Sequence, residues 1–132
     1  MMTLAGYALT LALLGAPAQN HHTARLTAYC KKCPDGGGPR TRTEELVGEG
    51  GVAADPRYWG PGSIVEIKLK SGWTRRRVND TGGAIKGKWR FDLGFSNHRM
   101  CTRLSGKRQV RVILWKAPVP VRKWPNLGKG RR

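Results

Sequence analysis

The chain is poor in acidic residues, with 8 Asp and Glu against 25 Lys and Arg in 132 residues. It also has only three cysteines, and no internal repeat stands out. The length argues against a two-domain enzyme, and the lack of a Gly-rich phosphate fingerprint argues against most dinucleotide- and ATP-binding folds. The formal net charge of +17 instead predicts a polyanionic partner, which could be nucleic acid, anionic lipid or an acidic polymer of a cell envelope.

The first 18 residues contain no charged side chain. Leu4 to Leu14 form an apolar run that is short for a membrane-spanning helix, which needs about 20 residues. Ala16-Pro17-Ala18 then places small residues two apart, as at a signal-peptide cleavage site. We therefore predict a signal peptide over 1–18 and export to the periplasm, the cell envelope or the extracellular space. The alternative is a buried or uncleaved membrane-proximal helix.

Alternating apolar and polar residues predict a mainly β domain over 24–118. The clearest alternation covers 63–70, and a second one over 91–95 places Asp92 on the face opposite its apolar neighbours. Ser96 is a candidate N-cap for one short helix. About six short strands with one or two short helices form most naturally a closed barrel.

Two stretches stand out for their basic side chains. Residues 119–132 combine prolines with basic side chains and contain no acid, which predicts a flexible basic tail. Arg75-Arg76-Arg77 places an arginine on each face of a predicted strand, which favours a ladder of positive charge at the surface.

The three cysteines allow more than one interpretation. Cys30 and Cys33 form a C-x-x-C pair, and His98 and Cys101 form an H-x-x-C pair. In an exported protein, three cysteines permit one disulfide and leave one thiol. The four residues could instead make a Cys3His zinc site, although the second pair lacks the context of a metal knuckle. We favour a disulfide between two of the three cysteines, leave free thiols and zinc open, and expect no metal or other cofactor.

Three of the few acids, Asp55, Asp80 and Asp92, stand near glycine or proline at predicted strand ends. Burial or a second carboxylate raises the pKa of an Asp, which can then donate a proton near neutral pH. Glycosidases commonly use such a pair of carboxylates. The other interpretation of each Asp is a turn cap or an ion-pair partner of one of the many arginines.

Five stretches, taken in order, carry a more specific signal. They are Thr27-Ala28-Tyr29-Cys30, Val52-Ala53-Ala54-Asp55-Pro56 with Gly62-Ser63, Asp80-Thr81-Gly82-Gly83-Ala84-Ile85-Lys86-Gly87, Arg90-Phe91-Asp92-Leu93 and Arg111-Val112-Ile113-Leu114-Trp115-Lys116-Ala117-Pro118. Together they resemble the three-Asp (3D) domain of bacterial cell-wall proteins, which is related to the barrel domain of membrane-bound lytic transglycosylase A. The resemblance implies a six-stranded double-psi β-barrel that cleaves peptidoglycan glycan strands.

The resemblance also implies a mechanism. In a lytic transglycosylase, one acid protonates the glycosidic oxygen between N-acetylmuramate and N-acetylglucosamine. The same residue then deprotonates the primary hydroxyl of the muramate, which closes a 1,6-anhydro end without consuming water. Asp92 matches the catalytic acid/base, Asp80 matches its electrostatic and hydrogen-bonding partner, and Asp55 matches a third, supporting carboxylate.

The resemblance further implies a substrate groove. The expected substrate-binding residues are Thr27, Tyr29, Thr81, Gly82, Gly83 and Lys86. For Lys86, a place on a solvated face is the alternative. Trp59 and Trp89 lie in predicted loops near the groove, where a tryptophan either stacks on a sugar ring or fills the core. Trp73 and Trp115 are expected in the core.

Two alternatives remain open. Four residues separate Gly87 from Asp92, one more than is usual in the family, and a β-bulge can absorb the extra residue. A displaced Asp92 would leave a non-catalytic module that binds the cell wall. The charge alone would also suit a nucleic-acid-binding protein, which the export signal disfavours. We expect a monomer that binds peptidoglycan glycan strands and anionic wall polymers, and no specific nucleic acid.

Overall fold

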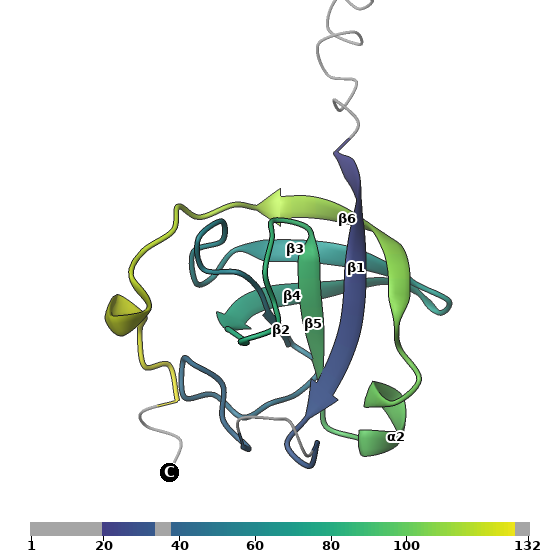
Figure 1. Ribbon diagram of the computed structural model, residues 1–132, viewed down its shortest axis with the longest axis horizontal. Coiled ribbons are helices and arrows are strands. Elements are labelled where there is room, and N and C mark those ends of the chain that lie inside the picture. Colours follow the sequence, from purple (N-terminus) through teal and green to yellow (C-terminus); the bar gives the residue numbers. More distant parts are fainter. Residues whose placement is uncertain (1–19, 34–37, 129–132) are drawn as a thin grey trace, which may run out of the picture.

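Six strands close into a barrel in the order β1-β5-β2-β4-β3-β6 (Figure 1), which confirms the predicted double-psi β-barrel with little helix. The computed structural model describes residues 20–33 and 38–128. The elements are β1 (His21–Cys30), β2 (Gly51–Ala53), β3 (Ile64–Leu69), β4 (Gly72–Asp80), β5 (Arg90–Phe95), α2 (His98–Cys101), β6 (Gly106–Leu114) and the 3-10 turn η1 (Val121–Lys123). The predicted signal peptide, 1–18, lies outside the described residues.

The strand pairing places two of the predicted carboxylates on either side of one short strand. β1 pairs with β5 and β2 pairs with β4 in parallel, whereas the other four pairs are antiparallel. Because β2 lies between β4 and β5, Ala53 pairs with Asp80 on one side and with Asp92 on the other. The two Asp positions are therefore separated by two strand spacings, or about 10 Å between Cα atoms.

The barrel interior follows the alternation in the sequence. Val65 and Ile67 of β3 are fully buried, as are Phe91 and Leu93 of β5. Asp92, between the last two, is only half-buried. This is the pattern of strands that pack one face on the core and turn the other outward.

The arginine run of β4 is not a continuous ladder of surface charge. Arg76 is buried and donates a hydrogen bond to the Gly51 carbonyl at 3.1 Å. Its burial lowers the pKa of the guanidinium to about 10. Arg75 and Arg77 each form an ion pair with a glutamate. The predicted ladder is therefore wrong, because one arginine belongs to the interior and two are paired.

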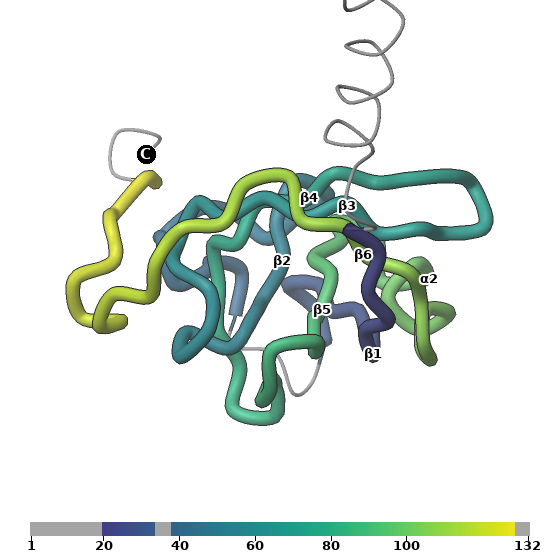
Figure 2. The backbone as a smooth tube through the Cα atoms, turned by 90° about the horizontal axis from the view of Figure 1, so that it is seen from above, coloured from purple at the N-terminus to yellow at the C-terminus, as the bar shows by residue number. Residues whose placement is uncertain are grey.

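The last described residues, 119–128, run at one side of the molecule (Figure 2) and are fixed there by contacts at Trp124 and Gly128, whereas residues 129–132 of the predicted basic tail lie outside the described residues. Trp124 is 9% exposed and joins the hydrophobic core. The amides of Leu127 and Gly128 both donate to the Thr43 carbonyl, at 2.9 and 3.2 Å. These contacts hold the segment beside the loop that precedes β2.

The short helix α2 begins one residue later than its predicted cap. Asn97, rather than Ser96, is the N-cap, and its side chain accepts a hydrogen bond from the Arg99 amide at 2.8 Å. No helix in the described part of the chain combines the length and the apolar character that crossing a membrane requires.

Candidate active site

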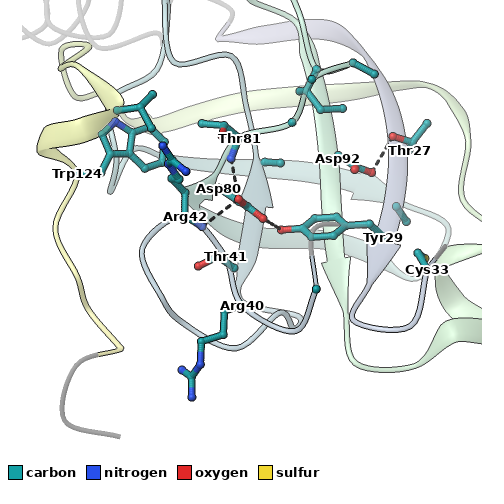
Figure 3. A pocket seen from close by; sticks show the side chains of 18 of the residues that line it. Thr27, Tyr29, Cys33, Arg40, Thr41, Arg42, Asp80, Thr81, Asp92 and Trp124 are labelled. Carbon is teal, nitrogen blue, oxygen red and sulfur yellow. Dashed lines mark hydrogen bonds between the residues drawn. The ribbon is translucent and has the colours of Figure 1, made fainter. Parts of the chain in front are cut away.

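A groove of about 970 Å³ crosses the barrel beside β1, β4 and β5. Thr27, Tyr29, Asp80 and Asp92 all line it (Figure 3). The loop after β4, the loop before β2 and residues 121–126 complete its walls. The groove therefore brings together residues from stretches of sequence that lie far apart.

Asp80, at the end of β4, is held by three donors. The Tyr29 hydroxyl donates to Oδ2 at 2.8 Å, and the amides of Arg42 and Thr81 donate to Oδ1 at 3.0 and 2.9 Å (Figure 3). Burial raises the pKa of Asp80, while these hydrogen bonds act in the opposite direction. Burial, reinforced by the neighbouring Asp80, also raises the pKa of Tyr29, so its phenol remains a donor to the carboxylate.

Asp92, in the middle of β5, has a less polar environment. Its hydrogen-bond donor within the described residues is the Thr27 hydroxyl, which lies 2.7 Å from Oδ1. Burial raises the pKa of Asp92 and the charge of Asp80 acts in the same direction, whereas the Thr27 hydrogen bond and the charge of Arg90 oppose them. The four-residue spacing after Gly87 therefore leaves Asp92 in the groove, with a carboxyl group whose pKa lies above its ordinary value.

Asp55 lies outside the groove lining and has a different environment. Its side chain is fully buried and accepts hydrogen bonds from the Arg57 guanidinium, at 2.7 to 3.1 Å, and from the Gly87 amide at 2.8 Å. The hydrogen bond from Arg57 holds the pKa of Asp55 well below its usual range. Gly87 has φ of +102°, a conformation that favours glycine. Asp55 therefore anchors the end of the loop that carries Thr81 to Lys86.

Of the predicted substrate-binding residues in that loop, all but one line the groove. Thr81, Gly82 and Gly83 line the groove, whereas Lys86 does not. A Cβ on Gly82 would lie 2.8 Å from a side-chain carbon of Ile85, so the tight turn leaves no room for a larger residue.

The structure decides between the two interpretations of Trp59 and corrects the one of Trp115. Trp59 is 1% exposed and its indole donates to a main-chain carbonyl at 2.8 Å, so it fills the core rather than stacking on a sugar. Trp89 is half-buried against the core and is not part of the groove lining. Trp73 is half-buried, and Trp115, predicted in the core, is 54% exposed.

Several groove residues were not predicted from the sequence. Arg40, Arg42, Arg90 and Arg122 line the groove and make its rim basic, and Trp124 supplies an aromatic side chain. Arg90 stands two residues before Asp92 in one of the stretches that resemble the 3D domain. Residues two apart on a strand point to the same face, so this spacing could have predicted that Arg90 lines the groove. The other four give no local signal, because only the folding of the loop before β2 and of residues 119–128 brings them to the groove.

The three cysteines are free thiols, of which Cys33 and Cys101 line the groove. The sulfur atoms of Cys30, Cys33 and Cys101 lie 3.1 to 3.6 Å apart, whereas a disulfide requires about 2.05 Å. The favoured disulfide is therefore not formed in this structure. His98 completes the cluster, and the potential ligand atoms of the four residues lie within 4.8 Å of one another.

The barrel and its paired carboxylates define a class, and comparison with known proteins gives the family. Residues 51–116, half of the chain, match the 3D domain family. The chain therefore belongs to the 3D domain family, and the matched part contains Asp55, Asp80 and Asp92. Family and fold together fit a cell-wall-related double-psi β-barrel. A comparison with curated proteins gave no match.

Among solved structures, the chain is similar to an expansin of Clavibacter michiganensis. The apo expansin is 18% identical with a TM-score of 0.46, and a point mutant in complex with cellohexaose is 14% identical with a TM-score of 0.44. Each similarity covers 76% of this chain and 52% of the expansin chain. The chain thus spans about half the length of these expansins.

Proposed function

We propose that this protein is an exported lytic transglycosylase that cleaves the β-1,4 bond between N-acetylmuramate and N-acetylglucosamine in peptidoglycan. The observation that carries the proposal is the environment of Asp92. Its carboxyl group faces a groove in a member of the 3D domain family, has a raised pKa and lies near a second carboxylate. A protonated carboxyl group in such a place is suited to general acid catalysis.

Asp92 serves as the acid and then as the base. Its proton passes to the glycosidic oxygen as the bond from that oxygen to the anomeric carbon of the muramate breaks. The resulting carboxylate accepts the proton of the muramate primary hydroxyl, whose oxygen bonds to the anomeric carbon. The products are a 1,6-anhydro end and a released saccharide with a free hydroxyl, and Asp92 is protonated again.

Asp80 is the partner that remains ionised. Three donors stabilise its carboxylate, whereas Asp92 has one, so Asp80 is assigned the ionised role and Asp92 the role of the acid. A negative Asp80 also favours the oxocarbenium-like transition state, in which positive charge develops on the sugar.

The basic rim supplies attraction for the substrate. Arg42, Arg90 and Arg122 line the groove, and peptidoglycan carries carboxylates on its peptide stems. The formal net charge of +17 adds a long-range attraction that salt weakens. We assign this charge to adhesion to an anionic wall rather than to nucleic acid.

The test is incubation of the purified protein with peptidoglycan sacculi, followed by mass spectrometry of the soluble products. Wild type is expected to release 1,6-anhydro-muropeptides, and Asp92→Asn is expected to lower the rate by about 10²- to 10⁴-fold. Glu49→Gln is the matched control, because it makes the same carboxylate-to-amide change on an exposed residue outside the groove lining. Circular dichroism should show that both variants fold.

Other products would contradict the proposal in identifiable ways. Products with reducing ends would indicate a hydrolase, in which water attacks the anomeric carbon. Binding to sacculi without products, equal in wild type and Asp92→Asn, would indicate a non-catalytic wall-binding module. Failure to bind sacculi, combined with retention on DNA that salt abolishes, would indicate a nucleic-acid-binding protein.

A further inference from the structure

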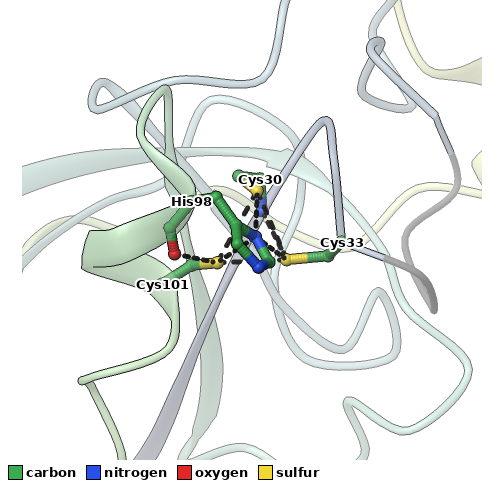
Figure 4. A group of neighbouring side chains, drawn as sticks. All are labelled: Cys30, Cys33, His98 and Cys101. Carbon is green, nitrogen blue, oxygen red and sulfur yellow. Dashed lines mark hydrogen bonds between the residues drawn. The ribbon is translucent and has the colours of Figure 1, made fainter.

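Four potential metal ligands meet where β1 ends against α2 (Figure 4). Cys30 is the last residue of β1, and Cys33 follows after a two-residue turn closed by a hydrogen bond from the Cys33 amide to the Cys30 carbonyl at 3.2 Å. His98 and Cys101 are three residues apart on α2, so both side chains project from one face of the helix. The fold thus joins two short motifs from distant parts of the chain.

The four atoms form the corners of a tetrahedron. The three Sγ–Sγ distances are 3.4, 3.1 and 3.6 Å, and the distances from His98 Nδ1 to the sulfurs of Cys30, Cys33 and Cys101 are 3.2, 3.8 and 3.5 Å. Tetrahedral Zn²⁺ with bonds of about 2.3 Å to sulfur and about 2.0 Å to nitrogen gives edges of about 3.8 and 3.5 Å. The six edges are therefore near those of a zinc site.

We propose that Cys30, Cys33, His98 and Cys101 bind one Zn²⁺ ion. A disulfide would leave one of the three thiols without a partner, whereas a Cys3His site uses every cysteine of the chain. Four protein ligands leave no open position for a water or a substrate, so the site is structural rather than catalytic.

The surroundings of the cluster suit a thiolate-rich site. The Cys30 amide lies 3.3 Å from Cys33 Sγ and donates to it. Such hydrogen bonds orient and stabilise a ligand sulfur. Three thiolates and Zn²⁺ carry one net negative charge, and the basic residues Lys31, Lys32 and Arg99 stand between the ligands in the sequence.

Zinc at this place would fix the walls of the groove. β1 carries Thr27 and Tyr29 ahead of Cys30, and α2 follows directly after β5, which carries Asp92. A bond network through the metal would tie the ends of both strands together without touching the carboxylates. The proposal does not depend on the proposed activity, since a wall-binding module would need the same support.

The experiment measures metal bound to the full chain purified without added metal chelator. Elemental mass spectrometry is expected to find one zinc per chain, and Co²⁺ exchanged for it should give the intense absorption of tetrahedral thiolate-bound cobalt. Cys33→Ser and His98→Asn, which replace the two more accessible ligands, are expected to weaken zinc binding by more than about tenfold. His21→Asn is the control, because His21 is exposed on β1 outside the cluster.

Thermal unfolding supplies a second measurement. A chelator is expected to lower the Tm of wild type and of His21→Asn, added zinc should restore it, and both ligand variants should respond less to each. If a variant does not fold, release of zinc from the wild type on titration of its thiols with a mercurial still tests the site. Absence of zinc, iron in its place, equal zinc in ligand and control variants, or a disulfide in the native protein would each overturn the proposal.

Discussion

The Thr27 hydroxyl donates a 2.7 Å hydrogen bond to Asp92, and the two residues face one another in the parallel pair of β1 and β5. Thr27 thereby opposes the burial that raises the pKa of Asp92. Because the hydroxyl stabilises the ionised form, it lowers the pH at which the carboxyl group loses its proton.

Replacing Thr27 by valine should therefore raise the pKa of Asp92 further. In the proposed reaction Asp92 must be protonated at the start, so the alkaline limb of the pH–rate profile should move to higher pH. Release of anhydro-muropeptides over a pH series measures the shift. Thr23→Val makes the same change on an exposed part of β1 and should leave the profile in place; a shift in both variants, or in neither, would contradict this role of Thr27.

Asp80→Asn should move the alkaline limb of the pH–rate profile to lower pH. The charge of Asp80 raises the pKa of Asp92, so removing it lowers that pKa and the acid is lost at lower pH. The rate at the optimum should also fall, because the amide no longer stabilises positive charge on the sugar. Glu49→Gln is the matched control, and a limb that moves upward in Asp80→Asn would rule out the assigned electrostatic coupling.

Alternation along the strands predicts a closed β-barrel, whereas the assignment of Asp80 and Asp92 to a groove comes from the resemblance of five stretches to the 3D domain. Period-two alternation fixes which faces of β3 and β5 are buried, and the glycines after Asp80 mark the tight turn beside the groove. The four-residue spacing before Asp92 does not determine which face of the strand its side chain occupies. The register with Thr27 and Ala53 determines its position, and strand register depends on the whole sheet rather than on local sequence.

The features that the sequence did not predict depend on contacts between distant segments. Composition does not distinguish Trp59, which is buried, from Trp115, which is exposed. Likewise the central arginine of the β4 run, Arg76, is buried because main-chain carbonyls of other strands accept its hydrogen bonds. The meeting of the two cysteine-containing motifs is of the same kind, since no local pattern places β1 beside α2.

Asp55→Asn tests the anchoring carboxylate through stability. The native pKa of Asp55 is lowered, chiefly by the hydrogen bond from Arg57, below the value of about 3.9 for an unfolded chain. Its contribution is therefore present above that value and is lost as pH falls through the native pKa. At neutral pH the variant should lose about 2 kcal/mol of unfolding free energy, and the difference from wild type should vanish in acid.

Urea unfolding at several pH values measures this difference. Glu66→Gln breaks ion pairs of a carboxylate whose side chain is 14% exposed, against 0% for Asp55, and should cost less. A difference that persists unchanged into strong acid would mean that the charge of Asp55 is not what stabilises the loop.

Arg42 and Arg122 test the basic rim of the groove. Replacing both by alanine should weaken binding to sacculi by about two- to fivefold per arginine and reduce its salt dependence. The amide of Arg42, which donates to Asp80, is retained in the alanine variant. Arg103 and Lys107 are exposed outside the groove lining, so the double alanine variant at these positions removes the same charge; an equal loss there would attribute binding to net charge alone.

Trp124→Ala tests whether residues 119–128 belong to the fold. The Trp124 side chain is 9% exposed and packs on the core, so its removal should cost about 3 kcal/mol of unfolding free energy. Trp115→Ala removes the same side chain from a position that is 54% exposed and should cost much less. Because Trp124 also lines the groove, its variant should lose binding to sacculi at temperatures where the barrel remains folded. Equal unfolding free energies for the two variants would show that residues 119–128 do not stabilise the barrel.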